Sequence, residues 1–161
     1  MILILDEIEA HLHPRWQRSI LRSVLDVAES LHAQAKLQVI ASTHSPLVLA
    51  SAEPLFDDKT DAWFDLDLNK KTSVVELRKR PFVRHGDASR WLTSDAFDLE
   101  EARSIPAEQA IREAKAFAKR AKRSLKDAKA IDAKLRAVGL PDIDPFWVRW
   151  SYMMDELKEG K

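Results

Sequence analysis

Two short runs of large apolar residues frame the first part of the chain. Ile2 to Leu5 and Leu37 to Ala41 have no regular alternation with polar residues, which is typical of strands buried on both faces of a parallel sheet. Between them, from Pro14 to about Ala33, apolar residues recur at spacings of three and four and predict an amphipathic helix. The order strand, helix, strand predicts a parallel pair with a right-handed crossover.

Apolar and polar positions alternate farther along the chain. Residues 62–68 and 73–79 alternate around the turn Asn69-Lys70-Lys71, which predicts a β-hairpin with one solvated face. Short helices are expected on either side of the hairpin, over residues 45–51 and 86–91. The fold class is therefore expected to be α/β.

A helical pattern dominates the last third of the chain. From Ala110 to Val138 apolar or small residues fall at alternating steps of four and three, the period of a coiled-coil seam, and we predict one long helix over residues 106–138. Gly139 should end it. A second helix over residues 144–157, capped by Asp144, should pack its large side chains against the alanine-rich seam.

Composition narrows the class of protein. The chain has 161 residues, of which 45% are hydrophobic and 32% charged, as in ordinary globular domains. It has no cysteine, so disulfides and thiolate metal sites are excluded, and a cytoplasmic location is expected. No apolar run approaches the roughly 18 residues that a membrane span needs, so no membrane partner is expected.

The formal net charge is zero, but the charge is unevenly distributed. Ten basic and three acidic residues lie between Arg112 and Arg136, so this segment carries +7 and the rest −7. Such a separation favours a polyanion or an acidic partner, although a solvated helix face is the alternative. The candidate nucleic-acid contacts are Lys119, Arg120, Lys122 and Arg123.

An acidic pair, Asp6 and Glu7, directly follows the first apolar run. Carboxylates in this position lie where a parallel sheet opens to ligands. Phosphoryl transfer to water needs a metal ion and a group that orients the water. Asp6 suits the role of Mg²⁺ ligand through a water, and Glu7 suits the role of base. A divalent-metal nuclease using Asp6, Glu7 and Glu9 is another interpretation, but it lacks the spaced acids and lysine of such enzymes.

The second apolar run is followed by Ser42-Thr43-His44-Ser45-Pro46, with His44 37 residues after Glu7. This segment resembles the switch-histidine segment of ABC-type ATPases, in which a histidine contacts the terminal phosphate. An imidazole in that place can hydrogen-bond the phosphate and sense its loss. A histidine with a purely structural role in the loop is the alternative.

The segment after the acidic pair, Glu9-Ala10-His11-Leu12-His13-Pro14, extends the resemblance. Its His-x-His pair lacks a third metal ligand at useful spacing. The segment resembles the D-E-I-x-x-H-L-H-P stretch of prokaryotic SMC-like and OLD-like ATPases of the AAA family, where it occupies the D-loop position at which two nucleotide domains meet. Three later blocks resemble ATPases of bacterial anti-phage systems, including Septu-like and retron-linked ones: Trp63 to Leu68, Trp91 to Phe97, and Arg103-Ser104.

The resemblance implies the C-terminal half of an ATP-binding, ATP-hydrolysing ABC-type domain. Its fold would be a partial P-loop NTPase parallel sheet with a β-hairpin and a C-terminal helical hairpin or arm. Residues 1–104 would carry the Walker B acids, the D-loop-like segment and the switch histidine, and residues 105–161 the arm. The implied cofactors are Mg²⁺ and ATP. The implied partners are an N-terminal ATPase half or a full-length copy, a dimer of nucleotide domains, DNA and an HNH-type nuclease, in anti-phage defence or DNA repair.

One departure from the family pattern changes the expected activity. No G-x-x-x-x-G-K-[ST] motif occurs in the sequence, so the backbone cradle and lysine for the phosphates are missing. We therefore expect the isolated chain to be inactive, whether it is a truncation or a stand-alone fragment. The alternative function is a catalytically dead remnant that binds nucleic acid or a nuclease through its basic helix.

Overall fold

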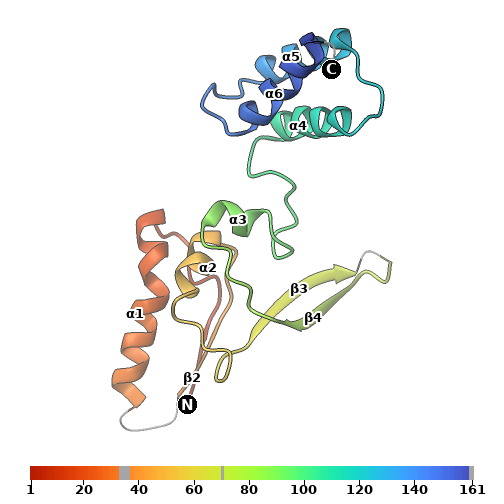
Figure 1. Ribbon diagram of the computed structural model, residues 1–161. Coiled ribbons are helices and arrows are strands. Elements are labelled where there is room, and N and C mark those ends of the chain that lie inside the picture. Colours follow the sequence, from red (N-terminus) through yellow and green to blue (C-terminus); the bar gives the residue numbers. More distant parts are fainter. Residues whose placement is uncertain (33–36, 70, 160–161) are drawn as a thin grey trace. The chain divides into compact units, whose positions relative to one another are not determined.

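The computed structural model describes residues 1–32, 37–69 and 71–159, which form a mixed α/β structure (Figure 1). Two compact units are present, Met1–Leu99 and Glu100–Lys161. The predicted helix end at Ala33 and Lys70 of the predicted turn lie outside the described residues. Within the described part of the chain, no helix combines the length and the apolar character needed to cross a bilayer.

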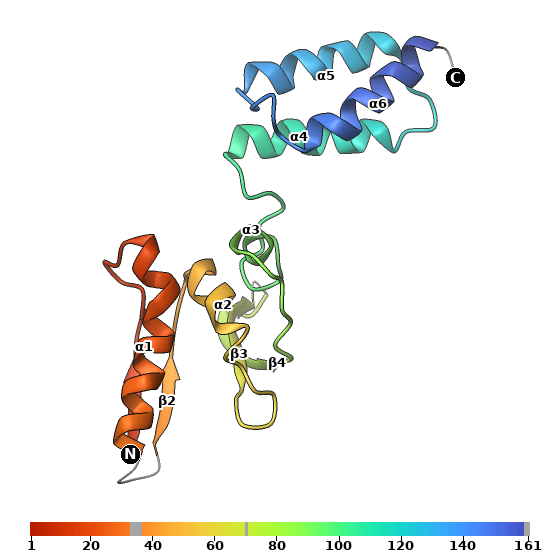
Figure 2. The same cartoon turned by 60° about the vertical axis from the view of Figure 1, so that its left-hand side comes forward.

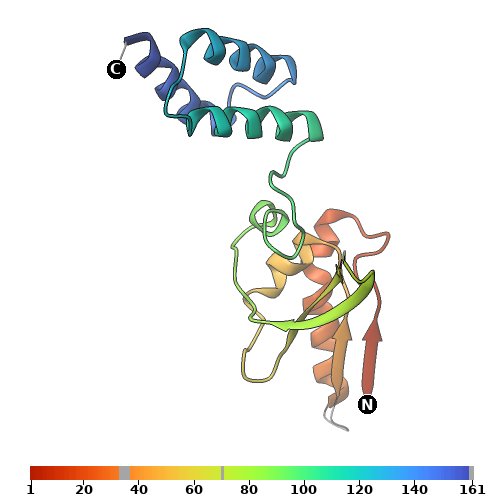
Figure 3. The ribbon, with the colours of Figure 1, turned by 90° about the vertical axis from the view of Figure 1, so that its right-hand side faces the viewer.

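The first unit begins with the predicted strand–helix–strand segment. It consists of β1 (Ile2–Leu5), α1 (Pro14–His32) and β2 (Gln38–Ala41). The two strands pair in parallel, with Ile2 opposite Gln38 and Leu5 opposite Ala41, and α1 lies along one face of the pair (Figures 1 and 3). The predicted parallel β–α–β unit is confirmed.

The expectation that these strands are buried on both faces was wrong for the described residues. Ile2 and Ile4 are 61% and 70% exposed, whereas Leu3 and Leu5 are half-buried. Because successive side chains of a strand point to opposite faces, the face with Leu3 and Leu5 is the one that α1 shields. Ile40 of β2 is also 48% exposed. The sheet therefore presents an uncovered apolar face.

The rest of the first unit holds the elements predicted after β2. These are α2 (Pro46–Ala52), β3 (Trp63–Asn69), β4 (Val74–Arg80) and α3 (Ala88–Leu92). They confirm the hairpin and both short helices. The core between them is formed by Leu49, Ala52, Phe82 and Trp91.

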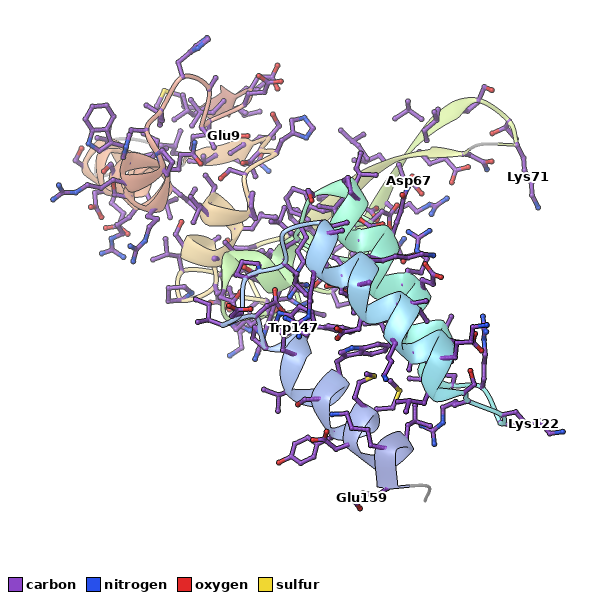
Figure 4. The ribbon with its side chains drawn as sticks, turned by 90° about the horizontal axis from the view of Figure 1, so that it is seen from above. Glu9, Asp67, Lys71, Lys122, Trp147 and Glu159 are labelled. Atoms are coloured by element: carbon purple, nitrogen blue, oxygen red, sulfur yellow. The ribbon has the colours of Figure 1, made fainter. Side chains whose placement is uncertain are left out.

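The two faces of the hairpin differ in polarity, but the expectation of a single solvated face was wrong for the described residues, because the apolar face is exposed as well. On one face Arg80 pairs with Asp65 at 2.9 Å, and Arg78 pairs with Asp67 at 3.5 Å. Figure 4 labels Asp67 on this hairpin and Lys71 near its tip. The opposite face is apolar and exposed in the described structure; it carries Phe64, Leu66, Leu68, Val75 and Leu77.

We predicted two helices in the second unit, but its described residues form three (Figure 2). They are α4 (Ile105–Ala118), α5 (Leu125–Ala137) and α6 (Phe146–Glu159). The single helix over residues 106–138 was therefore wrong. Ser124 interrupts it with an extended backbone (φ −103°, ψ 144°), and its Oγ accepts a hydrogen bond from the N–H of Asp127 at 3.1 Å. This Ser-x-x-Asp pattern is a recognised helix start.

Burial of the seam explains why the helix is broken. A straight helix of 33 residues would be about 50 Å long, and the 14 residues of α6 would cover only about 21 Å of it. Folding α5 back lets both halves of the seam share one core, where Phe117, Ala128 and Leu135 are fully buried. The predicted packing against the last helix is confirmed, since the same core contains Trp150 and Met153.

The predicted ends of the last two helices are also confirmed. Gly139 follows α5 with a φ of 70°, a left-handed conformation that glycine adopts at little cost. Asp144 Oδ1 accepts a hydrogen bond from the N–H of Phe146 at 2.8 Å. Its carboxylate also pairs with Arg103 at 2.8 Å, which ties the start of α6 to the segment before α4.

Candidate functional site

The predicted catalytic and cofactor-binding residues, Asp6, Glu7 and His44, follow the carboxyl ends of β1 and β2. Leu5 is opposite Ala41 in the sheet, so Asp6 and Ser42 are the first residues beyond the paired strands. The N–H of Ser42 donates to the carbonyl of Leu5 at 2.9 Å and extends the ladder by one bond. The structure thus brings the acidic pair and the segment that contains His44 to the same edge of the sheet.

The hydroxyl of Ser42 joins the two loops directly. It donates to Asp6 Oδ1 at 2.5 Å and accepts from the N–H of Glu7 at 2.8 Å. Glu7 has a φ of 45°, in the left-handed region that costs a residue with a side chain about 1 kcal/mol or more. The Ser42 hydroxyl therefore binds both members of the acidic pair: Asp6 through its carboxylate and Glu7 through the N–H of its strained backbone.

A second carboxylate, that of Glu9, makes another connection between the same loops. Its Oε2 accepts from the hydroxyl of Thr43 at 2.5 Å, and its Oε1 accepts from the N–H of His44 at 2.5 Å. Burial raises the pKa of Glu9, but the hydrogen bonds from Thr43 and His44 outweigh it, so this pKa lies below its ordinary value of 4.5. Glu9, labelled in Figure 4, is therefore ionised at neutral pH.

The start of α2 belongs to the same hydrogen-bond network. Ser45, which is 5% exposed, caps α2 by accepting from the N–H groups of Leu47 and Val48 at 3.2 and 3.3 Å. Its hydroxyl donates to Gln17 Oε1 at 2.8 Å, and Gln17 Nε2 donates to the carbonyl of Leu12 at 2.9 Å. Helix α1 and both loops are thereby joined.

The two histidines that follow Glu9 lie in the turn that leads into α1. His13 Nδ1 accepts from the N–H of Arg15 at 3.2 Å, and the His13 carbonyl accepts from the N–H of Trp16 at 2.8 Å. His13 therefore caps α1. His11 has a φ of 61°, the left-handed backbone of the turn before that helix.

The described residues of the site do not include a cluster of metal ligands. Within the described residues, no group of three or more His, Cys, Asp or Glu side chains could hold a metal ion, which gives no support to a nuclease centre. Asp6 is an exposed oxygen donor at the edge of the sheet. It fits Mg²⁺, which commonly takes one or two protein carboxylates and fills its other positions with water and substrate phosphate.

The four candidate nucleic-acid contacts lie in a turn, which corrects their predicted place on a helix. Helix α4 ends at Ala118, and the residues between it and α5 include Lys119, Arg120, Lys122 and Arg123. Figure 4 shows the side chain of Lys122 directed away from the helices. We call these four residues the basic turn.

Four cations of the helices beside the basic turn are paired with carboxylates, whereas Lys126 and Lys129 of α5 have no carboxylate partner among the described residues. The paired residues are Arg112 with Glu100 and Glu108, Lys115 with Glu101, Lys134 with Glu113, and Arg136 with Asp132. None of the four cations of the basic turn has a carboxylate partner among the described residues. Arg120 instead lies over the ring of Phe117 at 5.7 Å.

Two residues of the network, Ser42 and Gln17, were missed as functional candidates, and Glu9 was considered only as part of a nuclease centre. Their positions gave a partial signal, since Ser42 is the first polar residue after its strand and Glu9 follows the acidic pair closely. Their partners, however, are 28 to 36 residues away in the chain. Only the register of the two strands decides which hydroxyl meets which carboxylate.

Comparison with known proteins points to the same segment. A sequence model of the family described as "AAA domain, putative AbiEii toxin, Type IV TA system" matches residues 2–50. That range contains β1, α1, β2, most of α2 and the whole hydrogen-bonded network. The resemblance to ATPases of the AAA family is confirmed.

Individual relatives extend the match beyond the site. A Septu protein PtuA from Bacillus mycoides (strain KBAB4) is 34% identical over 98 residues, which are 61% of this chain and 12% of the relative. The Retron Vc95 probable ATPase of Vibrio cholerae serotype O1 biovar El Tor is 42% identical over 50 residues, 31% of this chain and 9% of the relative. A Septu protein PtuA from Bacillus thuringiensis is 29% identical over 107 residues, 64% of this chain and 24% of the relative. The chain thus spans at most a quarter of the length of these relatives.

Proposed function

We propose that the chain supplies the Walker B acids and the switch histidine of an ABC-type ATP-hydrolysing site, within a partial P-loop NTPase sheet. The observation that supports this proposal is the junction at the carboxyl ends of two parallel strands. There Ser42 bonds Asp6 and Glu7, and Glu9 bonds the backbone of His44. Ligands of open parallel sheets bind at this edge.

Each residue has a defined role in the proposal. Asp6 would bind Mg²⁺ through a water, and the ion, when bound, neutralises charge on the phosphate oxygens. Glu7 would accept a proton from the attacking water and orient it. His44 would donate a hydrogen bond to the terminal phosphate and respond to its departure.

The phosphate cradle would come from a second polypeptide, either an N-terminal ATPase half or a full-length copy. The sequence has no P-loop motif, and the described sheet has only two strands. Its uncovered face carries Ile2, Ile4 and Ile40, whereas parallel sheets are ordinarily covered on both faces. Further strands and a helix from the P-loop half would cover this surface, and two completed sites would meet in a dimer of nucleotide domains.

The proposal is tested with the purified chain, with and without a P-loop half taken from a full-length relative. The chain alone should neither bind Mg-ATP at micromolar concentration in calorimetry nor hydrolyse it. With the second half added, phosphate release should appear. Glu7→Gln should abolish turnover and leave nucleotide binding intact, because the amide cannot act as a base.

Glu29→Gln is the matched control, since Glu29 is an exposed carboxylate on α1 outside the network. It should leave turnover unchanged. Turnover that survives Glu7→Gln, or micromolar ATP affinity of the chain alone, would contradict the proposed site.

A second function is favoured by the basic turn. Its four cations lack carboxylate partners in the described structure, whereas four cations of the neighbouring helices are paired. We propose that this turn binds the phosphates of DNA, or an acidic surface of a nuclease such as an HNH enzyme, and would do so even in a chain without ATPase activity. The likeness to Septu and retron proteins supports placing both functions in anti-phage defence.

A further inference from the structure

We propose that Glu9 is the positioning residue that fixes His44, so that the loop after β1 controls the place of the histidine after β2. The inference rests on the proposed ATPase function for its catalytic consequence, but its structural part concerns this chain alone. Glu9 binds both the side chain of Thr43 and the N–H of His44, each at 2.5 Å. No other carboxylate among the described residues bonds to both residues.

The placement of the His44 side chain depends on its backbone. Among the described residues, no hydrogen bond to the His44 imidazole is found, and the residue is exposed. The backbone is held from both sides: the N–H of His44 donates to Glu9, and the N–H of Ser45 donates to Thr43 Oγ1 at 3.0 Å. Thr43 in turn donates to Glu9, so both restraints end on the same carboxylate.

Glu9 is itself tied to the acidic pair. The N–H of Ala10 donates to the carbonyl of Glu7 at 2.7 Å, and the N–H of Ile8 donates to the carbonyl of Ser42 at 3.1 Å. The first bond closes a short turn from Glu7 to Ala10 that contains Glu9, and the second joins this turn to the loop after β2. A displacement of the acidic pair would therefore move Glu9 and, through it, the backbone of His44. The positions of Glu7 and His44 are thus linked through hydrogen bonds.

Two substitutions separate hydrogen bonding from mere bulk. Glu9→Ala removes both acceptors and frees the N–H of His44. Glu9→Gln keeps one oxygen for that N–H, and its amide can donate to Thr43 Oγ1, which has a free lone pair. A positioning role through hydrogen bonds therefore predicts loss in the alanine variant and rescue in the glutamine variant.

The restraint that Glu9 places on the His44 backbone is measured in the full chain by amide hydrogen exchange with NMR. In Glu9→Ala the His44 amide should exchange at least about tenfold faster, as expected for the loss of one hydrogen bond to a charged group. The amide of Ser42, which bonds to Leu5 in the extended sheet, reports on the fold and should be unchanged. Glu9→Gln and the control Glu29→Ala should match the original chain. If Glu9→Ala does not fold, Thr43→Val tests the same restraint through its other end and should also speed exchange at His44.

The catalytic part is measured in the complex with a P-loop half. Glu9→Ala should lower kcat about tenfold while KM for ATP stays unchanged, and Glu9→Gln should restore kcat. Unchanged exchange at His44 in a folded Glu9→Ala or Thr43→Val variant overturns the positioning role. Faster exchange with normal kcat overturns its catalytic consequence. Absent turnover in the unsubstituted complex would instead refute the proposed function, and the exchange data would still decide whether Glu9 positions His44.

Discussion

A single carboxylate, that of Glu53, holds the loop that leads from β4 into α3. Its Oε1 accepts from the N–H of His85 at 2.7 Å, from the N–H of Gly86 at 2.8 Å and from Trp91 Nε1 at 2.8 Å. Burial raises the pKa of Glu53, but the hydrogen bonds from Gly86, His85 and Trp91 outweigh it, and this pKa lies below 4.5. One charged side chain thus fixes both a loop and a core tryptophan.

Replacing Glu53 by alanine should lower the free energy of unfolding of the first unit by about 1 to 3 kcal/mol at pH 7. Because the folded pKa is below the unfolded value, the contribution is fully present above pH 4.5 and is lost as the pH falls through the folded pKa. The difference between the original chain and Glu53→Ala should therefore shrink at pH 3. Urea unfolding of the whole chain, followed at the Trp91 indole N–H by NMR, measures it.

Other carboxylates also respond to acid, since Glu9 and Glu76 have lowered pKa values as well. Comparing Glu53→Ala with the original chain at each pH removes the contribution of these other carboxylates, because both proteins contain them. Glu29→Ala serves as the exposed control and should match the original chain at both pH values. A Glu53→Ala deficit that is as large at pH 3 as at pH 7 would show that the loop depends on packing rather than on the charge.

At the scale of the element, the break between α4 and α5 decides which small residues form the core. The coiled-coil pattern places Ala121 and Ala128 on the same seam, one heptad apart. In the structure Ala121 lies in the turn and is exposed, whereas Ala128 is fully buried. The two alanines therefore distinguish a continuous helix from the folded-back pair.

Ala128→Lys should destabilise the second unit by about 3 kcal/mol or more, because a long charged side chain would enter a filled core. Ala121→Lys introduces the same side chain at an exposed position and should change stability by no more than about 0.5 kcal/mol. Urea unfolding followed at the indole N–H of Trp150, which donates to Asp132 at 3.0 Å, measures both. Equal losses in the two variants would favour the continuous helix.

At the scale of the whole molecule, a net charge of zero conceals a division into paired and unpaired cations. The helices of the second unit pair some of their cations with nearby carboxylates, but Lys126 and Lys129 have no such partner among the described residues. The basic turn keeps four cations without such partners in the described structure. Exposed ion pairs contribute little to stability, but they remove charge from the field that a polyanion would experience. The turn is therefore the part of this unit best suited to contact phosphates.

Binding of duplex DNA by the whole chain should weaken with salt, and the basic turn should carry the dependence. Changing Lys119, Arg120, Lys122 and Arg123 to alanine should reduce the slope of log affinity against log salt concentration by about three to four units if all four contact phosphates. A fluorescence anisotropy series from 50 to 200 mM salt, roughly the range over which such contacts are resolved, measures the slope.

The matched control changes four paired cations, Arg112, Lys115, Lys134 and Arg136, to alanine. Its net charge equals that of the turn variant, so a diffuse electrostatic attraction would weaken equally in both. Salt-insensitive binding by the original chain, or equal slopes in the two variants, would mean that the basic turn is a solvated surface.

Much of the fold could be predicted because it depends on local patterns. The apolar runs predicted β1 and β2, periodicity predicted α1 and α6, and alternation predicted the hairpin. The capping residue Asp144 marked the start of the last helix correctly. The break after Ala118 was missed because a 3.5-residue period continues across it. The cap at Ser124 was the signal against one continuous helix, but the residues on both sides of it are good helix formers.

The sequence by itself determined which residues could carry chemistry: Asp6, Glu7 and His44 stand directly after two apolar runs, and residues 2–50 match an ATPase family. Only the tertiary structure decided how these residues are held. Parallel pairing of β1 with β2 places Ser42 against the acidic pair and Glu9 against His44, contacts between residues about 35 positions apart. Such contacts depend on strand register, and register is a property of the packed sheet, because the hydrogen bonds form only after both strands and α1 have come together.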